Sequence, residues 1–288
     1  YPDRNKPQNF LMKSRKKKLA EILVQRGYAT TEEKARRMIL AGEVTVKGVD
    51  RPKPGVLLPE DVEISVSQSA VDRYVGRGAL KLEHALKSFQ IDPMGCICLD
   101  VGASTGGFTE CLLRHGAEKV YAVDAGYGQL HYRLRNDPRV VVMERVNARY
   151  PVDIPEPIDL ATIDVSFISV KLVLPSIESH LRKAGEAIFL LKTQFEAKKR
   201  DVPAGGIIRD PDLHVRVIMH TLESLIKKGW KIYGLIPSPI KGAKGNREYL
   251  VRIGKESGGE IPEKNLEGKI RETVKKTFNH NADGNLNK

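Results

Sequence analysis

Apolar positions along most of the chain follow two alternating rhythms, those of short buried strands and of amphipathic helices. From Leu80 onward, short apolar runs predict strands over residues 97–101, 119–123, 140–143, 159–164, 186–192, 231–236 and 248–253. Helical spacing between most of these runs predicts helices, for example over 107–115, 171–183 and 212–228. Strands that alternate with helices predict an α/β fold with a mostly parallel, doubly wound sheet of seven strands.

Residues 13–66 show a shorter rhythm of their own. The stretch "KKKLAEILVQRGYA" places apolar side chains such as Leu19 and Ile22 at helical spacing and predicts a first helix. Thr30 as N-cap and Glu33 three residues later form a capping box that predicts the start of a second helix. Short strand-like runs follow. The segment therefore predicts a small α+β domain.

Polarity predicts how the remaining segments divide into leader, linker, domain and tail. Residues 1–12 resemble a disordered leader, and residues 67–78 are polar, contain glycine and predict a linker. A larger domain over 79–254 follows. The tail over 255–288 is polar, and its spaced apolar residues Leu266, Ile270 and Val274 predict one last helix, with disorder as the alternative.

The net charge indicates which class of partner the protein binds. The 288 residues carry a net charge of +12, which favours a polyanionic partner, nucleic acid first and an anionic membrane second. A merely cationic, solvated surface is the plain alternative. No apolar run approaches the roughly 18–20 residues of a transmembrane helix, and the first residues do not resemble a signal peptide, so no membrane partner is expected.

The cysteines and histidines indicate the cellular compartment and whether the protein has a metal site. Cys96 and Cys98 would point to one face of a strand, and with Cys111 the total is odd, which argues against a disulfide framework. No Cys and His residues stand at metal-ligand spacing, so no metal site is expected. These features predict a reducing, cytoplasmic compartment.

The stretch "LDVGASTGGFTECLL" reads as a strand, a glycine-rich turn and a helix, the layout that holds an adenosine-containing ligand. The turn lacks the dinucleotide pattern G-x-G-x-x-G, and no G-K-[ST] follows. Asp124 ends the next strand, where a carboxylate can hold ribose hydroxyls. Together these features suit S-adenosylmethionine, while an ordinary strand–turn–helix is the alternative. The residues expected to hold it are Asp100, Gly102, Ala103, Ser104, Thr105, Gly106, Gly107, Phe108 and Asp124.

Two lysines and two carboxylates are expected at one edge of the sheet. Asp164 and Lys192 end strands, and Lys81 begins a helix. Glu248 begins the last strand and reaches the same edge if that strand is antiparallel. A ribose hydroxyl needs a base during methyl transfer. A lysine can serve as this base in its neutral form. A second ammonium nearby and partial desolvation favour the neutral form, whereas the two carboxylates favour the charged form.

The ordered set Lys81, Asp164, Lys192 and Glu248 resembles the Lys-Asp-Lys-Glu tetrad of FtsJ/RrmJ-type ribose 2'-O-methyltransferases. The motifs "RGALKLEHAL", "DVGASTGGFT", "TIDVSFIS", "LLKTQFEA", "GGIIRDP" and "NREYL" resemble, in order, the TlyA (haemolysin A) family of rRNA cytidine 2'-O-methyltransferases. That resemblance implies a Rossmann-like class I methyltransferase domain with Lys192 as base, Asp164 and Lys81 positioning it, and Glu248 completing the site. It also implies that Asn147 and Asp164 approach the cofactor.

The small domain is similar to the S4 RNA-binding module, in the rhythm of Ala35, Ile39, Gly42, Val44 and Val46. The resemblance implies that it docks on ribosomal RNA within ribosomal subunits through phosphate contacts. Two further basic loops, "EAKKRDVPAGGIIRDP" and "SPIKGAKGNRE", are expected near the target nucleotide. The expected RNA-contacting residues are Lys16, Lys17, Lys18, Lys34, Arg36, Arg37, Lys198, Lys199, Arg200, Arg209, Lys241 and Lys244.

The sequence leaves several points open. It shows no aromatic cluster for stacking a base, and Phe167 and Phe195 are candidates only by position. A membrane-active haemolysin and a non-catalytic RNA-binding assembly factor are the competing functions. A monomer is the default expectation for the oligomeric state.

Overall fold

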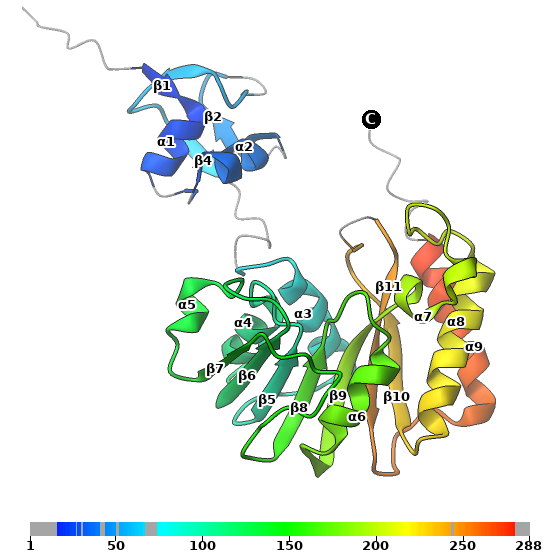
Figure 1. The fold of residues 1–288 in the computed structure, drawn as a ribbon. Coiled ribbons are helices and arrows are strands. Elements are labelled where there is room, and N and C mark those ends of the chain that lie inside the picture. Colours follow the sequence, from blue (N-terminus) through cyan, green and yellow to red (C-terminus); the bar gives the residue numbers. More distant parts are fainter. Residues whose placement is uncertain are drawn as a thin grey trace, which may run out of the picture. The chain divides into compact units, whose positions relative to one another are not determined.

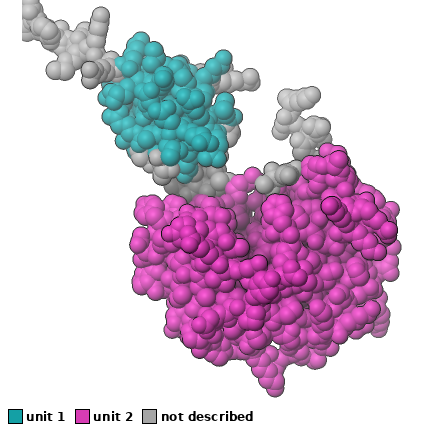
Figure 2. All heavy atoms as spheres, viewed as in Figure 1, with its two compact units in different colours: residues 1–73 teal, residues 74–288 magenta. Residues whose placement is uncertain are grey.

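The computed structural model describes residues 16–26, 28–29, 31–40, 44–49, 52–66, 74–242 and 245–279. The chain divides into two compact units, residues 1–73 and 74–288 (Figure 2). Each unit has a hydrophobic core of its own, and each is described by itself.

The smaller unit packs two helices with two short pairs of strands. Its elements are β1 (Lys16–Lys18), α1 (Leu19–Gln25), α2 (Glu32–Leu40), β2 (Val44–Val46), β3 (Leu57–Pro59) and β4 (Ile64–Val66). β1 pairs with β3 and β2 pairs with β4, both antiparallel. Leu23 of α1 and Ile39 of α2 lie in the shared core. The apolar spacing of the two predicted helices therefore marks their buried faces.

Two details of this unit differ from the sequence-based expectation. Lys16–Lys18 form a strand and do not begin the first helix, because their backbone pairs with β3 some forty positions further along the chain. The second helix begins at Glu32, and its cap is Thr31, whose hydroxyl accepts a hydrogen bond from the Lys34 N–H at 3.2 Å. Thr30, the predicted cap, lies outside the described residues.

The larger unit is a three-layer α/β domain with a sheet between two layers of helices (Figure 1). Its strands are β5 (Ile97–Val101), β6 (Lys119–Asp124), β7 (Val140–Glu144), β8 (Ile158–Ile163), β9 (Leu181–Lys192), β10 (Lys231–Pro237) and β11 (Glu248–Gly254). Its helices are α3 (Gly78–Phe89), α4 (Gly107–Arg114), α5 (Tyr132–Arg135), α6 (Val170–Glu178), α7 (Thr193–Glu196), the 3-10 turn η1 (Lys199–Asp201), α8 (Pro211–Ile226) and α9 (Glu263–Asn279).

The seven strands lie in the order β10-β11-β9-β8-β5-β6-β7. β11 is antiparallel to both of its neighbours, and the other pairings are parallel. The predicted mostly parallel sheet with one antiparallel strand is confirmed. Helices α3 and α4 cover one face, while α6, α8 and α9 cover the other, so the central strands are buried on both sides.

The chain changes direction at the middle of this sheet. After β5 it adds β6 and β7 on one side, and it then returns past β5 to add β8 and β9 on the other. The carboxyl ends of β5 and β8 therefore flank a crevice, the usual place of a ligand in an open α/β sheet.

Two segments depart from the predicted pattern, and the tail follows its predicted helix. The helix predicted over 171–183 ends at Glu178, because residues from Leu181 onward extend along β8 instead. Tyr74, within the predicted linker, is buried in the core of the larger unit. The tail is ordered over α9, whose Ile270 and Val274 are buried, so disorder is the wrong alternative for that part of the tail.

Candidate active site

The four predicted polar residues meet at the carboxyl edge of the sheet as two ion pairs. Glu248 stands directly opposite Lys192 in the register of β11 and β9, so the antiparallel direction of β11 brings it to this edge. Lys81 comes from the first turns of α3, and Asp164 follows the end of β8. Each lysine pairs with one carboxylate.

The first pair, Lys81–Glu248, is sealed. Lys81 Nζ lies 2.6 Å from Glu248 Oε2, and the two side chains are 10% and 4% exposed. Gly242 closes over the carboxylate, since a Cβ at that position would collide with Glu248 Oε1. Two charges buried this deeply are tolerable only while they remain paired.

The second pair, Lys192–Asp164, opens toward solvent on the carboxylate side. Lys192 Nζ lies 2.7 Å from Asp164 Oδ1, and the side chains are 10% and 20% exposed. The contact is an ion pair without the alignment of a hydrogen bond, and the Lys192 ammonium donates to Ser166 Oγ at 2.8 Å instead. The carboxylate and the hydroxyl together fix the position of the amine.

The glycine-rich turn brings its backbone close to Asp164. Gly102 has φ +85°, and a Cβ there would collide with the Asp164 carbonyl, so only glycine fits. Beside it, the Ser104 N–H donates to Asp124 Oδ2 at 2.8 Å. The Asp124 carboxylate also accepts from the Gly126 N–H at 2.6 Å. The turn is thereby fixed between β5, β6 and the end of β8.

A cavity of about 380 Å³ lies on this turn. Of the residues predicted to hold a cofactor, Gly102, Ser104, Asp124, Asn147 and Asp164 line it. The other predicted positions do not: Asp100, Ala103, Thr105, Gly106, Gly107 and Phe108. Phe108 belongs to the core, and Gly106 and Gly107 shape the start of α4.

Asp100 has a different place from the one predicted. It is fully buried, and its carboxylate accepts hydrogen bonds from the hydroxyls of Thr109 at 2.7 Å and Thr162 at 3.1 Å. Burial raises the pKa of Asp100 to about 7, because its effect is larger than that of the two hydrogen bonds, which lower the pKa. Asp100 therefore supports the turn from beneath and does not contact the cavity.

A second cavity, of about 780 Å³, adjoins the first. The second cavity adds Phe195 and other residues around α7. The lining residues common to both are Ala125, Asn147, Arg149, Ser166, Phe167 and Ile168. Of the open pair, Asp164 lines the first cavity, and Ser166, the hydrogen-bond partner of Lys192, lines both.

Phe167 and Phe195, which the sequence offered as candidates only by position, form an aromatic pair. Phe167 is 87% exposed and has φ +65°, and its ring centroid lies 5.1 Å from that of Phe195. Neither side chain is buried in the core. Sequence reasoning also missed Ser166 and Arg149, for which the only signal was that Ser166 follows Asp164 by two positions.

The predicted basic residues are mostly exposed. In the larger unit Lys198, Lys199, Arg200, Arg209 and Lys241 are exposed, and Lys199 lines the second cavity, while Lys244 lies outside the described residues. In the smaller unit Lys16, Lys18, Arg36 and Arg37 are exposed, and Lys17 and Lys34 are half-buried. Lys17 forms an ion pair with Glu60 at 2.8 Å.

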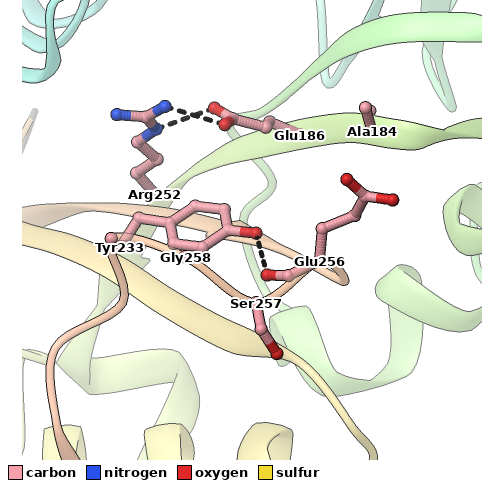
Figure 3. Close-up of a pocket in the computed structure, with 9 residues that line it drawn as sticks. Ala184, Glu186, Tyr233, Arg252, Glu256, Ser257 and Gly258 are labelled. Carbon is pink, nitrogen blue, oxygen red and sulfur yellow. Dashed lines mark hydrogen bonds and ion pairs between the residues drawn. The ribbon is translucent and has the colours of Figure 1, made fainter.

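A further pocket, of about 270 Å³, lies at the opposite edge of the sheet (Figure 3). Its charged groups already satisfy one another: both Arg252 nitrogens that face Glu186 lie 2.7 Å from its carboxylate oxygens. The Tyr233 hydroxyl donates to the Glu256 carbonyl at 2.6 Å. The chemistry of this domain is therefore expected at the carboxyl edge.

Among the described residues, no helix is both long and apolar enough to cross a membrane.

The chain is similar to several known proteins. The FtsJ-like methyltransferase family matches residues 74–255. The chain is 39% identical over 263 residues to the 16S/23S rRNA (cytidine-2'-O)-methyltransferase TlyA of Mycobacterium tuberculosis, covering 91% of this chain and 98% of that protein. It is 44% identical to Hemolysin A of Brachyspira hyodysenteriae, covering 82% and 99%. A solved structure from Streptococcus thermophilus that bears the name of a hemolysin is 36% identical, with a TM-score of 0.71 over 94% of this chain and 99% of that one.

Proposed function

The chain belongs to the FtsJ-like methyltransferase family, whose cofactor is S-adenosylmethionine, and from this premise we propose that it methylates a ribose 2'-hydroxyl of ribosomal RNA, with cytidine as the target nucleoside. The observation that carries the proposal is the open Lys192–Asp164 pair: its carboxylate lines the first of two adjoining cavities, and Ser166, which accepts a hydrogen bond from Lys192, lines both. A transfer between a donor and an acceptor needs two adjoining spaces and a base between them.

The first cavity suits the cofactor. Gly102 lines it and has no side chain, so a ligand can approach the backbone of the turn closely. Each oxygen of the Asp124 carboxylate accepts one backbone N–H and keeps a further lone pair for a ribose hydroxyl. When bound, S-adenosylmethionine supplies an electrophilic methyl group, which the ribose oxygen takes as the carbon–sulfur bond breaks and leaves its electron pair on sulfur.

Lys192 is the base in this proposal. In its neutral form the Nζ accepts the proton that the ribose hydroxyl loses, and the resulting ammonium is stabilised by Asp164 at 2.7 Å. Ser166 holds the Nζ from a second direction at 2.8 Å and so limits the positions it can adopt. The sealed Lys81–Glu248 pair anchors β11 beside Lys192 and does not itself face the cavities.

The second cavity is the proposed place of the acceptor nucleotide. A ribose within a helix would have to turn outward to reach Lys192. The exposed Phe167 ring, paired with Phe195, offers a face for the displaced base, and Arg149 and Lys199 offer charge to its phosphates.

The smaller unit is proposed as an S4-like docking domain. Its exposed Lys16, Lys18, Arg36 and Arg37 are suited to phosphate contacts, which supply affinity without selecting the target atom. In this reading the protein works on ribosomal subunits in the cytoplasm.

Mass spectrometry of ribosomal RNA tests the proposal. Subunits that lack the modification are incubated with the protein and S-adenosylmethionine, and the expected gain is one methyl on a ribose that then resists 2'-hydroxyl-dependent cleavage. The same incubation with Lys192→Ala should give no gain. Absence of methylation on both subunits and on naked RNA would favour the assembly-factor function, and red-cell lysis without the cofactor would favour the haemolysin.

A further inference from the structure

We propose that Asn246 and His214 form a polar clasp that positions the basic segment 197–209 for methyl transfer. The inference rests on the proposed function, because the segment is taken to contact RNA beside Lys192. The segment joins α7 to α8 and carries the exposed Lys198, Lys199, Arg200 and Arg209.

The segment has almost no apolar anchorage of its own. Among residues 197–209, Ile208 is the only buried one. Hydrophobic packing therefore cannot hold the whole segment in one arrangement, and the polar contacts around Ile208 become decisive.

Asn246 holds this segment from the loop that precedes β11. Its side chain is buried, its Oδ1 accepts from the Ile208 N–H at 3.2 Å, and its Nδ2 donates to the Gly206 carbonyl at 2.7 Å. Its own carbonyl accepts from the Gly242 N–H at 2.9 Å. One amide thus ties two loops of the carboxyl edge together.

His214 completes the clasp from α8. The fully buried ring places Nε2 3.1 Å from the Ile208 carbonyl and Nδ1 2.9 Å from the Tyr249 hydroxyl. Because a carbonyl can only accept, Nε2 carries the hydrogen and Nδ1 accepts from Tyr249. Ile208 is therefore held at both its N–H and its C=O.

The clasp reaches the catalytic edge through β11. Tyr249 follows Glu248, and successive side chains of a strand point to opposite faces. Lys81 holds Glu248 on the α3 face, and His214 holds Tyr249 on the α8 face. The same few residues thus fix the start of β11 and the end of the basic segment, which aligns the segment with Lys192, the register partner of Glu248.

Hydrogen exchange, trypsin cleavage and kinetics on the full-length protein test the clasp. In Asn246→Ala and His214→Ala, loss of one or two hydrogen bonds should speed exchange of peptides over 203–209 and cleavage after Lys198–Arg200 about fivefold or more. The KM for ribosomal RNA should rise by a similar factor, while the Kd for S-adenosylmethionine stays within about twofold. Asn246→Asp keeps the acceptor for Ile208 and should show an intermediate effect.

Thr221→Ala is the matched control. Thr221 is a fully buried residue of the same helix, and its hydroxyl donates to the Val217 carbonyl within α8, away from the segment. If the Ala variants do not fold, exchange and kinetics of Asn246→Asp are compared with those of Thr221→Ala instead.

The outcomes separate the two claims. Exchange over 203–209 that matches the Thr221→Ala control would overturn the clasp. Faster exchange with unchanged RNA kinetics would leave the contacts in place but overturn their positioning role. A wild-type protein that methylates no RNA would overturn the proposed function and the role in transfer, while exchange and trypsin cleavage would still show whether the clasp holds the segment.

Discussion

Two lysine–carboxylate pairs share one edge of the sheet, yet their surroundings differ. The two lysine side chains are equally buried, but the Glu248 carboxylate is 4% exposed with Gly242 over it, whereas the Asp164 carboxylate is 20% exposed and lines a cavity. A sealed pair can hold two elements together but cannot exchange a proton with a substrate. In the proposed function, this difference gives the first pair an anchoring role and the second pair a chemical one.

Replacing the open lysine should have the largest effect. Lys192→Ala removes the proposed base, so the rate of methyl transfer should fall by about 10²–10⁴-fold. Cofactor affinity by calorimetry should remain close to that of the wild type. Lys192→Arg should not rescue the rate, because a guanidinium does not give up its proton. A transfer rate near the wild-type value in Lys192→Ala would remove the contrast between the pairs.

Breaking the sealed pair should act on stability first. Glu248→Gln leaves the Lys81 ammonium buried without a counter-charge, so the free energy of unfolding in urea should fall by about 3–5 kcal/mol. Glu186→Gln, at the partly exposed pair with Arg252 on the opposite edge, is the control and should cost about 1 kcal/mol or less. Equal losses in both variants would show that the Lys81–Glu248 pair is not sealed.

The buried Asp100 beneath the glycine-rich turn should make the stability of the protein depend on pH. Its pKa is raised to about 7 in the folded protein, so the unfolded chain binds fewer protons than the folded one between about pH 4 and pH 7. Its contribution to stability is therefore lost as the pH rises through that window, by an amount on the order of a few kcal/mol. Urea unfolding of Asp100→Asn at several pH values should show a smaller decline. An equal decline would mean that Asp100 is ionised without cost.

Asp124→Ala should have the smallest effect and should act on binding. Loss of charge-assisted hydrogen bonds worth roughly 1.5–3 kcal/mol should weaken S-adenosylmethionine about tenfold to a hundredfold, as measured by calorimetry. Stability of the Lys192–Asp164 pair should be unaffected, since Asp124 bonds to the turn and not to Lys192. Unchanged affinity would remove Asp124 from the cofactor site.

The sequence by itself determined the fold of the larger unit and which four polar residues come together at the carboxyl edge of its sheet. Apolar runs marked the strands, because strands buried on both faces must be almost continuously apolar. The polar residues that end those runs, Asp164 and Lys192, then had to meet at one edge, since parallel strands end together.

Only the tertiary structure decided how those residues are paired and which of them are open. Burial depends on neighbours from distant parts of the chain: Gly242 closes over Glu248, and Thr109 and Thr162 surround Asp100. The same dependence moved Lys16–Lys18 into a strand with β3 and ordered α9 against the sheet. Local spacing fixes which face a side chain takes, but the packing of remote segments sets its exposure, its partner and hence its chemistry.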